Sequence, residues 1–301
     1  MSEPVHTGLE MTPSSENTLG ILYLVATPIG NLKDISLRAL DILSSVACIA
    51  AEDTRHTRKL LSHHGISSEL ISYREMNHSS ASMQIMKYLY QGKDVALVSD
   101  AGTPAISDPG QALVATVRHE GFSVVPIPGA CAAISALAAS GLPTDRFLFM
   151  GFLPRKKGAL AKLLEELRTE PGTLVFYESP KRILATLKNL RDGLGPRKAV
   201  VVRELTKIHE TFDSGTLPEL VRRYKGVTKG EITLLVQGAK DQAPKVKSPL
   251  DDLVAALRST NAMSAAQVAS LLSSTLDIDR KQVYRLASEF SIDQEDTGNE
   301  K

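Results

Sequence analysis

One stretch, residues 94–110, constrains the fold of this chain more than any other. It opens with the apolar run Val95–Val98, typical of a buried strand, and then changes abruptly to Asp, Gly, Ser, Thr and Pro. Because its prolines fix φ and its glycines permit conformations that a Cβ would forbid, the loop is expected to hold one shape. We predict that Asp108 and Pro109 form the N-cap and first turn of a following helix. A strand, a shaped loop and a helix are typical of open α/β sheets, in which ligands bind at the carboxyl ends of strands.

The rest of the first half repeats this alternation of strands and helices. Strands separated by helical patterns of about 10 to 15 residues predict parallel pairing. The expected strands are 21–26, 46–51, 70–73, 94–99 and 124–127. The second half mixes hairpin and crossover spacings, which predicts a mixed sheet. Its expected strands are 147–151, 173–177, 199–203, 210–214 and 232–237.

The predicted fold class is therefore α/β, with two α/β domains and a small helical domain. The Pro- and Lys-rich stretch that follows the second half is typical of a linker, and three short helical patterns beyond it have the size of a helix-turn-helix unit. The polar start and the acidic end of the chain are expected to be disordered. The predicted segments are a tail at 1–18, α/β domains at 19–143 and 144–239, a linker at 240–249, the helical domain at 250–291 and a second tail at 292–301.

Composition and charge exclude several classes of protein. The 35 basic and 34 acidic residues give a net charge of +1, so any nucleic-acid partner must be held by local patches. No apolar run is long enough to span a membrane and the start is not basic, so a cytoplasmic protein is expected. Cys48 and Cys131 both lie in apolar runs and are expected to be reduced. The histidines and cysteines lack metal-ligand spacing, so no metal is expected.

Four loops follow strands of the first half, at 27–31, 52–55, 99–108 and 128–129. Each alone is compatible with a simple tight turn, but in a parallel sheet all four lie at one edge, which predicts a binding site. The sequence has no G-x-x-x-x-G-K-[ST] and therefore no P-loop. It also lacks G-x-G-x-x-G after the first strand, and G-x-S-x-G, so a dinucleotide site, the usual glycine-rich methyltransferase site and a hydrolase elbow are not supported.

Charged groups also follow strands of the second half. Glu178 ends one strand, and Glu204 and Lys207 lie just after another. Such groups can accept a proton from a substrate hydroxyl, and an ion pair that merely ties two loops together is an equally good interpretation. The basic run 155–157 can bind phosphates, although most such runs are solvated surfaces.

Eight motifs, in unbroken order between about Gly20 and Gly238, resemble those of a known family. It is the family of bacterial small-subunit ribosomal RNA methyltransferases that 2′-O-methylate the ribose of a decoding-region cytidine, cytidine-1402 of 16S rRNA. The motifs are Thr27-Pro-Ile-Gly-Asn-Leu, Glu52-Asp-Thr-Arg, Ser99-Asp-Ala-Gly-Thr-Pro-Ala-Ile-Ser-Asp-Pro-Gly, Pro128-Gly-Ala, Gly151-Phe-Leu-Pro-Arg, Tyr177-Glu-Ser-Pro, Arg203-Glu-Leu-Thr-Lys and Lys229-Gly-Glu.

This resemblance implies a two-domain tetrapyrrole-methylase-like fold with a helix-turn-helix-like tail, usually as a homodimer. S-adenosyl-L-methionine would bind in the cleft between the α/β domains without a glycine-rich loop. The chain departs from the family pattern at Lys181, where histidine is expected, and around His78, which matches only loosely. The positions implied to bind the cofactor are Pro28, Gly30, Ser99, Asp100, Ala101, Gly102, Thr103, Asp108, Pro128, Gly129, Phe149, Met150 and Gly151.

Methyl transfer to a ribose hydroxyl is an in-line displacement at a sulfonium carbon, so the protein mainly aligns the reacting atoms. The candidates that would assist deprotonation are Glu204 and Lys207, followed by Glu178 and Asp100. The expected partner is 16S rRNA in the 30S subunit. Its backbone would be held by Arg155, Lys156, Lys157 and Lys181.

Two other functions remain open from the sequence. One is a small-molecule methyltransferase of the tetrapyrrole type. The other is a ligand-sensing regulator whose residues 264–290 bind DNA. The candidate recognition helix carries Arg280, Lys281 and Arg285, but acidic residues as well.

Overall fold

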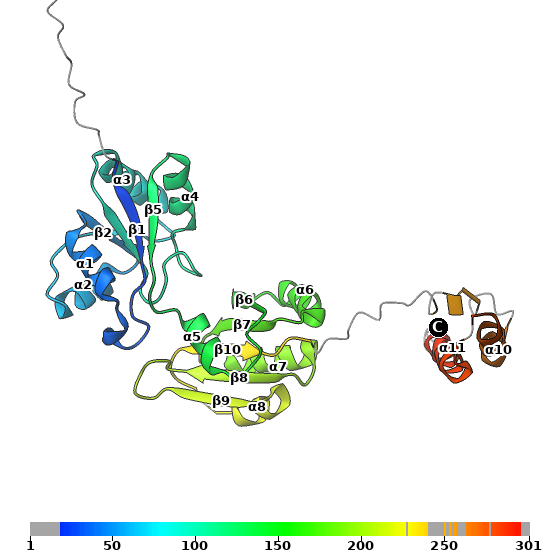
Figure 1. Cartoon of the computed structure of the whole chain (residues 1–301). Helices are drawn as coiled ribbons and strands as arrows, with labels where there is room; N and C mark the ends of the chain where they lie inside the picture. Colours follow the sequence, from blue (N-terminus) through cyan, green and yellow to red (C-terminus); the bar gives the residue numbers. More distant parts are fainter. Residues whose placement is uncertain are drawn as a thin grey trace, which may run out of the picture. The chain divides into compact units, whose positions relative to one another are not determined.

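The computed structural model describes residues 19–226, 228–239, 250, 253–254, 256–257, 263–276 and 278–295. The chain divides into two compact units, Met1–Ala239 and Lys240–Lys301. The first unit contains two five-stranded sheets, which define a first and a second lobe (Figure 1). The predicted tail 1–18, the predicted linker 240–249 and the end of the predicted C-terminal tail lie outside the described residues.

The first sheet is wholly parallel, as predicted, and its strand order is β3-β2-β4-β1-β5. Its central strands are buried on both faces, which explains their unbroken apolar sequences. All five strands end at the same edge, so the loops that follow them share that edge. The strands are β1 (Ile21–Val25), β2 (Cys48–Ala51), β3 (Glu69–Ser72), β4 (Val95–Val98) and β5 (Ser123–Ile127).

Helices cover both faces of this sheet. Apolar residues of α1 (Leu37–Ser45) and α2 (Thr54–His63) pack with one set of alternating strand residues. Those of α3 (His78–Tyr90) and α4 (Gln111–His119) pack with the other set. A 3-10 turn, η1 (Leu32–Asp34), precedes α1.

The predicted start of α4 is wrong. Its N-cap is Gly110, at φ 142°, and it has no side-chain cap. Leu97 Cδ2 lies only 2.9 Å from where a Cβ on Gly110 would be, so the chain turns tightly against the sheet there. This turn delays the helix to Gln111 and leaves Asp108 free for the loop.

The second sheet is mixed, as predicted, in the order β6-β7-β10-β8-β9. β6 pairs in parallel with β7, whereas the other three pairings are antiparallel. The strands are β6 (Phe147–Phe152), β7 (Thr173–Glu178), β8 (Lys198–Arg203), β9 (Thr211–Thr216) and β10 (Ile232–Val236).

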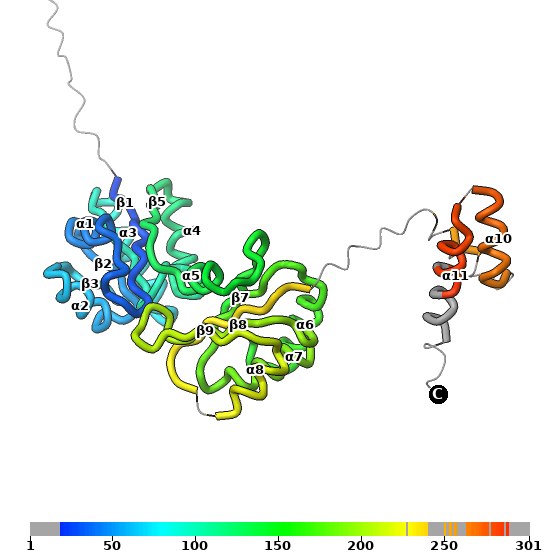
Figure 2. Tube along the Cα trace, turned by 60° about the horizontal axis from the view of Figure 1, so that its bottom comes forward, coloured from blue at the N-terminus to red at the C-terminus, as the bar shows by residue number. Residues whose placement is uncertain are grey.

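One face of this sheet packs against α5 (Ala132–Ala139), which follows the last strand of the first sheet (Figure 2). The other face is covered by α6 (Lys157–Glu166), η2 (Leu167–Thr169), α7 (Ile183–Leu194) and α8 (Leu217–Arg223). Helix α7 begins at Ile183, and a turn precedes it. The Ser179 carbonyl accepts bonds from the backbone N–H groups of Arg182 and Ile183, which form a turn before the helix.

The second unit contains α10 (Ala265–Leu276) and α11 (Arg280–Glu295). Ser264 and Asp279 accept backbone bonds at the two helix starts, as N-capping residues do. The helices pack through a small core that also includes Val254. In the described part of the chain, no helix is both long and apolar enough to cross a membrane.

Candidate active site

A cavity of about 470 Å³ lies where the carboxyl ends of the first sheet face the second lobe. Three of the four predicted loops contribute to its wall directly, and the fourth, 128–129, leads into wall residues Cys131 and Ala132. The second lobe closes the opposite side. The wall consists of Ile29, Glu52, Asp100–Thr103, Ile106–Asp108, Cys131, Ala132, Phe152, Tyr177–Pro180, Val202, Leu205 and Glu231–Thr233.

The loop after β4 holds one shape, as its prolines and glycines predict. Thr27 and Gly102 exchange two backbone bonds of 2.9 Å, which join this loop to the loop after β1. The buried Ser99 hydroxyl donates to the Ala101 carbonyl at 3.2 Å. Ala105 and Ser107 adopt positive φ of 68° and 63°, a conformation that costs energy without glycine. The loop is thus a rigid part of the cavity wall.

Two glycines among the predicted cofactor-binding residues allow the lobes to approach each other. A Cβ on Gly30 would lie 2.5 Å from Lys207 Cγ and 2.9 Å from the Leu205 carbonyl oxygen. A Cβ on Gly151 would lie 2.9 Å from Ser107 Oγ. Gly151 has φ +60° and follows a register shift in β6. Each lobe therefore presents a glycine to a loop of the other lobe.

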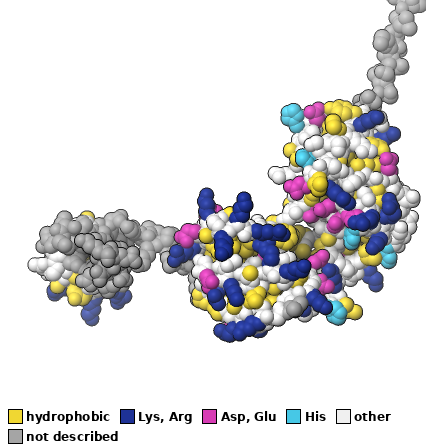
Figure 3. All heavy atoms as spheres, turned by 180° about the vertical axis from the view of Figure 1, so that it is seen from behind, with side chains coloured by type: hydrophobic (Ala, Val, Ile, Leu, Met, Phe, Trp, Pro, Cys, Tyr) yellow, Lys and Arg dark blue, Asp and Glu magenta, His cyan; other side chains and the backbone are white. Residues whose placement is uncertain are grey.

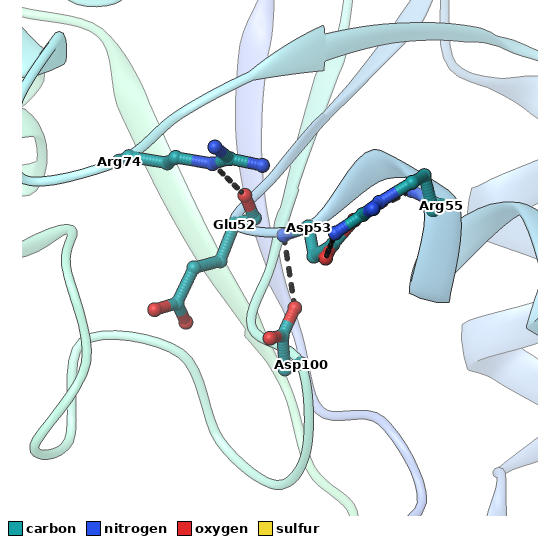
Figure 4. A network of polar contacts seen from close by, with 5 residues as sticks. All are labelled: Glu52, Asp53, Arg55, Arg74 and Asp100. Carbon is teal, nitrogen blue, oxygen red and sulfur yellow. Dashed lines mark hydrogen bonds and ion pairs between the residues drawn. The ribbon is translucent and has the colours of Figure 1, made fainter.

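Three acidic residues of the first lobe line the cavity: Glu52, Asp100 and Asp108. Asp100 Oδ1 accepts a 2.9 Å bond from the backbone N–H of Asp53 (Figure 4). None of the three takes part in an ion pair among the described residues, because the nearby arginines are engaged elsewhere. Arg55 pairs with Asp53 at 2.8 Å, and Arg74 Nε donates to the Glu52 carbonyl at 2.9 Å.

Burial and repulsion from neighbouring carboxylates act on the carboxyl groups of Glu52 and Asp108. Burial, followed by the charges of Asp100 and Asp108, raises the pKa of Glu52. Burial also raises the pKa of Asp108, partly offset by a hydrogen bond with Ser99. Because the described wall also contains Glu178 and Glu231 but no Lys, Arg or His, the cavity is an acidic pocket in which a cation would be stabilised.

Glu178 lies in the cavity wall, but its carboxylate is bound on the protein side. Its side chain is fully buried and accepts bonds from Thr186 Oγ1 at 2.5 Å and from the Ser179 backbone N–H at 2.7 Å. Arg182 Nε lies 3.5 Å from Glu178, and Arg182 Nη2 donates to the Leu153 carbonyl at 2.9 Å. This network ties together the loops that follow β6 and β7.

Glu204 and Lys207 form a second network, with Glu231. Lys207 Nζ lies 3.1 Å from Glu204 Oε1 and 2.9 Å from Glu231 Oε2. The backbone N–H of Glu231 and then Lys207 lower the pKa of Glu204. Burial opposes the charge on Lys207, but its bonds to both glutamates outweigh it and raise its pKa. The pair is therefore ionised, and of the three residues only Glu231 lines the cavity.

The predicted cofactor residues fall into two groups. Those that line the cavity are Asp100, Ala101, Gly102, Thr103 and Asp108. The others support the wall: a Cβ on Gly129 would meet Ala26, the Phe149 ring contacts the Tyr177 ring, and Met150 packs on the core of the opposite face. Three further residues do not line the cavity but lie next to wall residues in the chain or a few positions before them: Pro28, Ser99 and Pro128.

Sequence reasoning missed most of the apolar wall. Four apolar wall residues lie within the family motifs, and that position is the only feature of the sequence that could have pointed to them: Ile29, Ile106, Phe152 and Leu205. Phe152 is 57% exposed and lines the cavity, so part of its ring is open to a bound molecule. Cys131 is half-buried and, like the buried Cys48, is a free thiol. Among the described residues, no cluster of His, Cys, Asp or Glu could hold a metal ion.

The four predicted RNA-binding cations all lie exposed at one side of the cavity. Lys156 is the N-cap residue of α6 and lies between Arg155 and Lys157 in the chain. Lys181 lies in the turn before α7. Their neighbours Phe152 and Pro180 line the cavity. Figure 3 shows Lys and Arg side chains crowded on the second lobe beside a hollow, with acidic side chains on the first lobe.

Comparisons with known proteins agree with this arrangement. Residues 21–221 match the model of the tetrapyrrole (corrin/porphyrin) methylases. The chain is 44% identical over 279 residues to the ribosomal RNA small subunit methyltransferase I of Synechocystis, covering 91% of this chain and all of that one. It is 43% identical over 280 residues to the protein of the same name in Escherichia coli O157:H7, covering 92% and 97%.

Solved structures of low sequence identity share the fold. The cobalt precorrin-4 methyltransferase CbiF has a TM-score of 0.56 at 18% identity, over 72% of this chain and 94% of that one. The methyltransferase CobJ has a TM-score of 0.57 at 19% identity, over 73% and 95%. These likenesses concern the arrangement of the two lobes' strands and helices.

Proposed function

Because the chain belongs to the tetrapyrrole methylase family, and within it to the ribosomal RNA small subunit methyltransferase I proteins, we propose that it methylates small-subunit ribosomal RNA. The proposed reaction moves a methyl group from S-adenosyl-L-methionine to the ribose 2′-oxygen of a decoding-region cytidine, cytidine-1402 of 16S rRNA. The acceptor is proposed to be RNA within the 30S subunit, and the enzyme a cytoplasmic homodimer.

The negatively charged cavity is the observation that carries this proposal. S-adenosyl-L-methionine bears a sulfonium and an ammonium group, and both cations would be stabilised by Glu52, Asp100 and Asp108. A volume of about 470 Å³ lies in the range of small-molecule sites. The apolar wall residues offer a surface to an adenine ring, and the backbone at Gly102 can approach the ligand closely. The residues present therefore fit this cofactor.

The bound cofactor would supply a methyl group on a sulfonium, which is already a good leaving group. The protein then has to place one ribose hydroxyl in line and exclude water from the cavity. Asp100 is the predicted proton acceptor whose carboxylate faces the cavity without an ion pair among the described residues. Glu178, Glu204 and Lys207 hold the second-lobe side of the site in position through their mutual contacts.

The exposed cations at 155–157 and 181 support an RNA substrate. They lie beside the cavity rather than inside it, so phosphates would be held at the rim while a ribose reaches the interior.

The test is methyl transfer from cofactor labelled in its methyl group. The acceptors are 30S subunits from cells that lack this protein, naked 16S rRNA, a free porphyrinoid and duplex DNA. We expect label in the subunits, on the ribose of one cytidine identified by mass spectrometry of nuclease fragments. Label on the porphyrinoid and none on RNA would overturn the proposal. Asp100→Asn, with cofactor binding measured separately, tests proton transfer.

A further inference from the structure

Helix α2 of the first lobe exposes a row of cations to which the proposed function assigns no role. Arg55, Arg58 and Lys59 are all exposed, and the side chain of Arg55 is 81% exposed. The opposite side of the helix, with Thr57, is buried in the first lobe. The helix itself contains no acidic residue, and among the described residues its N-cap Asp53 forms an ion pair with Arg55 alone. Arg58 and Lys59 have no ion-pair partner in the described part of the chain.

These cations gain little stabilisation from the fold around them. Arg55 lies in the first turn of α2, where the helix dipole is positive and acidic residues are favoured, and Asp53 offsets its charge. Arg58 and Lys59 lie in the middle of the helix, and no ion pair holds either of them among the described residues. Charges arranged this way are well placed to bind an anion from outside the molecule.

The row also begins at the cavity. Thr54, the first residue of α2, follows Asp53 and the cavity residue Glu52 directly in the chain. At about 1.5 Å per residue, Lys59 lies only about 8 Å further along the helix axis. The exposed Arg74, bonded to the Glu52 carbonyl, adds a fourth cation at the same rim.

The cavity thus has cations on both sides and carboxyl groups within. The second lobe contributes residues 155–157 and 181 next to Phe152 and Pro180, and the first lobe contributes the row on α2 next to Glu52. A polyanion is attracted to both rims, whereas its phosphates are repelled by the interior. This charge pattern fits a nucleic-acid strand that crosses the cavity and offers it a sugar rather than a phosphate.

We propose that Arg55, Arg58 and Lys59 of α2, with Arg74, form a second phosphate-binding surface, so that the substrate RNA is held by both lobes across the cavity. This proposal rests on the proposed function, since it concerns the RNA of the same site. Binding here would position the RNA but would not take part in cofactor binding.

The decisive variant is Arg58→Glu/Lys59→Glu. Both side chains are exposed and neither lines the cavity, so folding and cofactor affinity should be retained. The matched control is Lys93→Glu/Arg118→Glu, which changes the net charge equally. Both control residues are exposed and precede strands, β4 and β5, at the edge of the first sheet away from the cavity.

Three quantities should be measured for each protein: cofactor affinity by calorimetry, affinity for 30S subunits over a range of salt concentrations, and kcat/KM for subunit methylation. We expect the α2 variant to lower kcat/KM about tenfold or more, with cofactor affinity within about twofold of wild type. For this variant, the slope of log affinity against log salt concentration should become shallower by about one to two units, because each lost phosphate contact reduces the slope by about 0.7 to 0.9. The milder variant Arg58→Gln/Lys59→Gln should give a kcat/KM and a salt dependence between those of the wild type and those of the charge-reversal variant of α2.

The proposal is overturned if the α2 variant binds and methylates subunits as the wild type and the control do, with the same salt dependence. It is also overturned if both charge reversals weaken subunit binding equally, since that would reflect net charge alone. A failure of the proposed function looks different, because the wild-type protein itself would then methylate no subunit.

Discussion

Gly30→Ala tests whether the contact between the lobes forms the cavity. The new methyl group would lie 2.5 Å from Lys207 Cγ, 2.7 Å from Thr206 Oγ1 and 2.9 Å from the Leu205 carbonyl oxygen. The lysine chain can move aside, but the carbonyl belongs to a backbone with positive φ at Glu204 and Thr206 and has little freedom. Overpacking of this kind costs about 1–3 kcal/mol.

A cost of about 2 kcal/mol lowers the Tm of a domain of this size by roughly 4–8 °C. If the 204–207 loop moves away from Gly30 instead, Leu205 and Glu231 shift in the cavity wall and cofactor affinity falls. We therefore expect a loss of stability, of cofactor affinity, or of both. Scanning calorimetry and isothermal titration with S-adenosyl-L-methionine measure the two quantities.

Gly158→Ala is the matched control. No atom lies within 4 Å of its added Cβ, and the residue is in the first turn of α6 without a positive φ. Removing glycine from a helix should leave stability unchanged or raise it by about 0.5–1 kcal/mol. The reasoning is refuted if Gly30→Ala behaves as this control does in both measurements.

Three further predictions concern single side chains. Burial raises the pKa of Glu52, so its ionised form destabilises the fold as pH rises through the carboxyl range. Glu52→Gln should therefore raise Tm at about pH 7.5, but not at about pH 4. The same variant should weaken binding of the sulfonium cofactor more than binding of its thioether product. Thr186→Val removes a hydrogen-bond donor to the buried Glu178, and should lower the free energy of unfolding in denaturant by about 1–3 kcal/mol. If the folded variant methylates at the wild-type rate, that result counts against Glu178 as a base. Phe152→Ala should change stability little, since the ring is half-exposed, and weaken cofactor binding about three- to tenfold in titration calorimetry; unchanged affinity would remove Phe152 from the site.

The arrangement of the first lobe was predictable because its signals are local. Apolar runs such as Val95–Val98 are buried on both faces, and their spacing by helices dictates parallel pairing. Parallel pairing then places the loops after β1, β2, β4 and β5 at one edge without any further information. For the same reason, the cavity could be expected at residues 99–108 before its shape was known.

The roles of individual residues depend on contacts that are distant in sequence. Gly30 approaches a loop some 175 residues later, and nothing near Gly30 in the chain indicates that partner. Glu178 could be a base or a structural anion, and only the positions of Thr186 and Arg182 reveal its partners. The early start predicted for α4 had a similar cause, because packing against Leu97 fixes the turn at Gly110.

Three connections together make the cavity a pre-formed site. The chain leaves β5 of the first sheet and enters α5, which packs on the second sheet, so Cys131 and Ala132 line the cavity from a segment that joins both lobes. The contact of Gly30 with the 205–207 loop and that of Gly151 with Ser107 fix the lobes at two further points. Rotation of one lobe against the other would have to break contacts at all three points. Since little ordering is then left for the ligand to impose, binding energy goes into alignment of the reacting atoms rather than into closure.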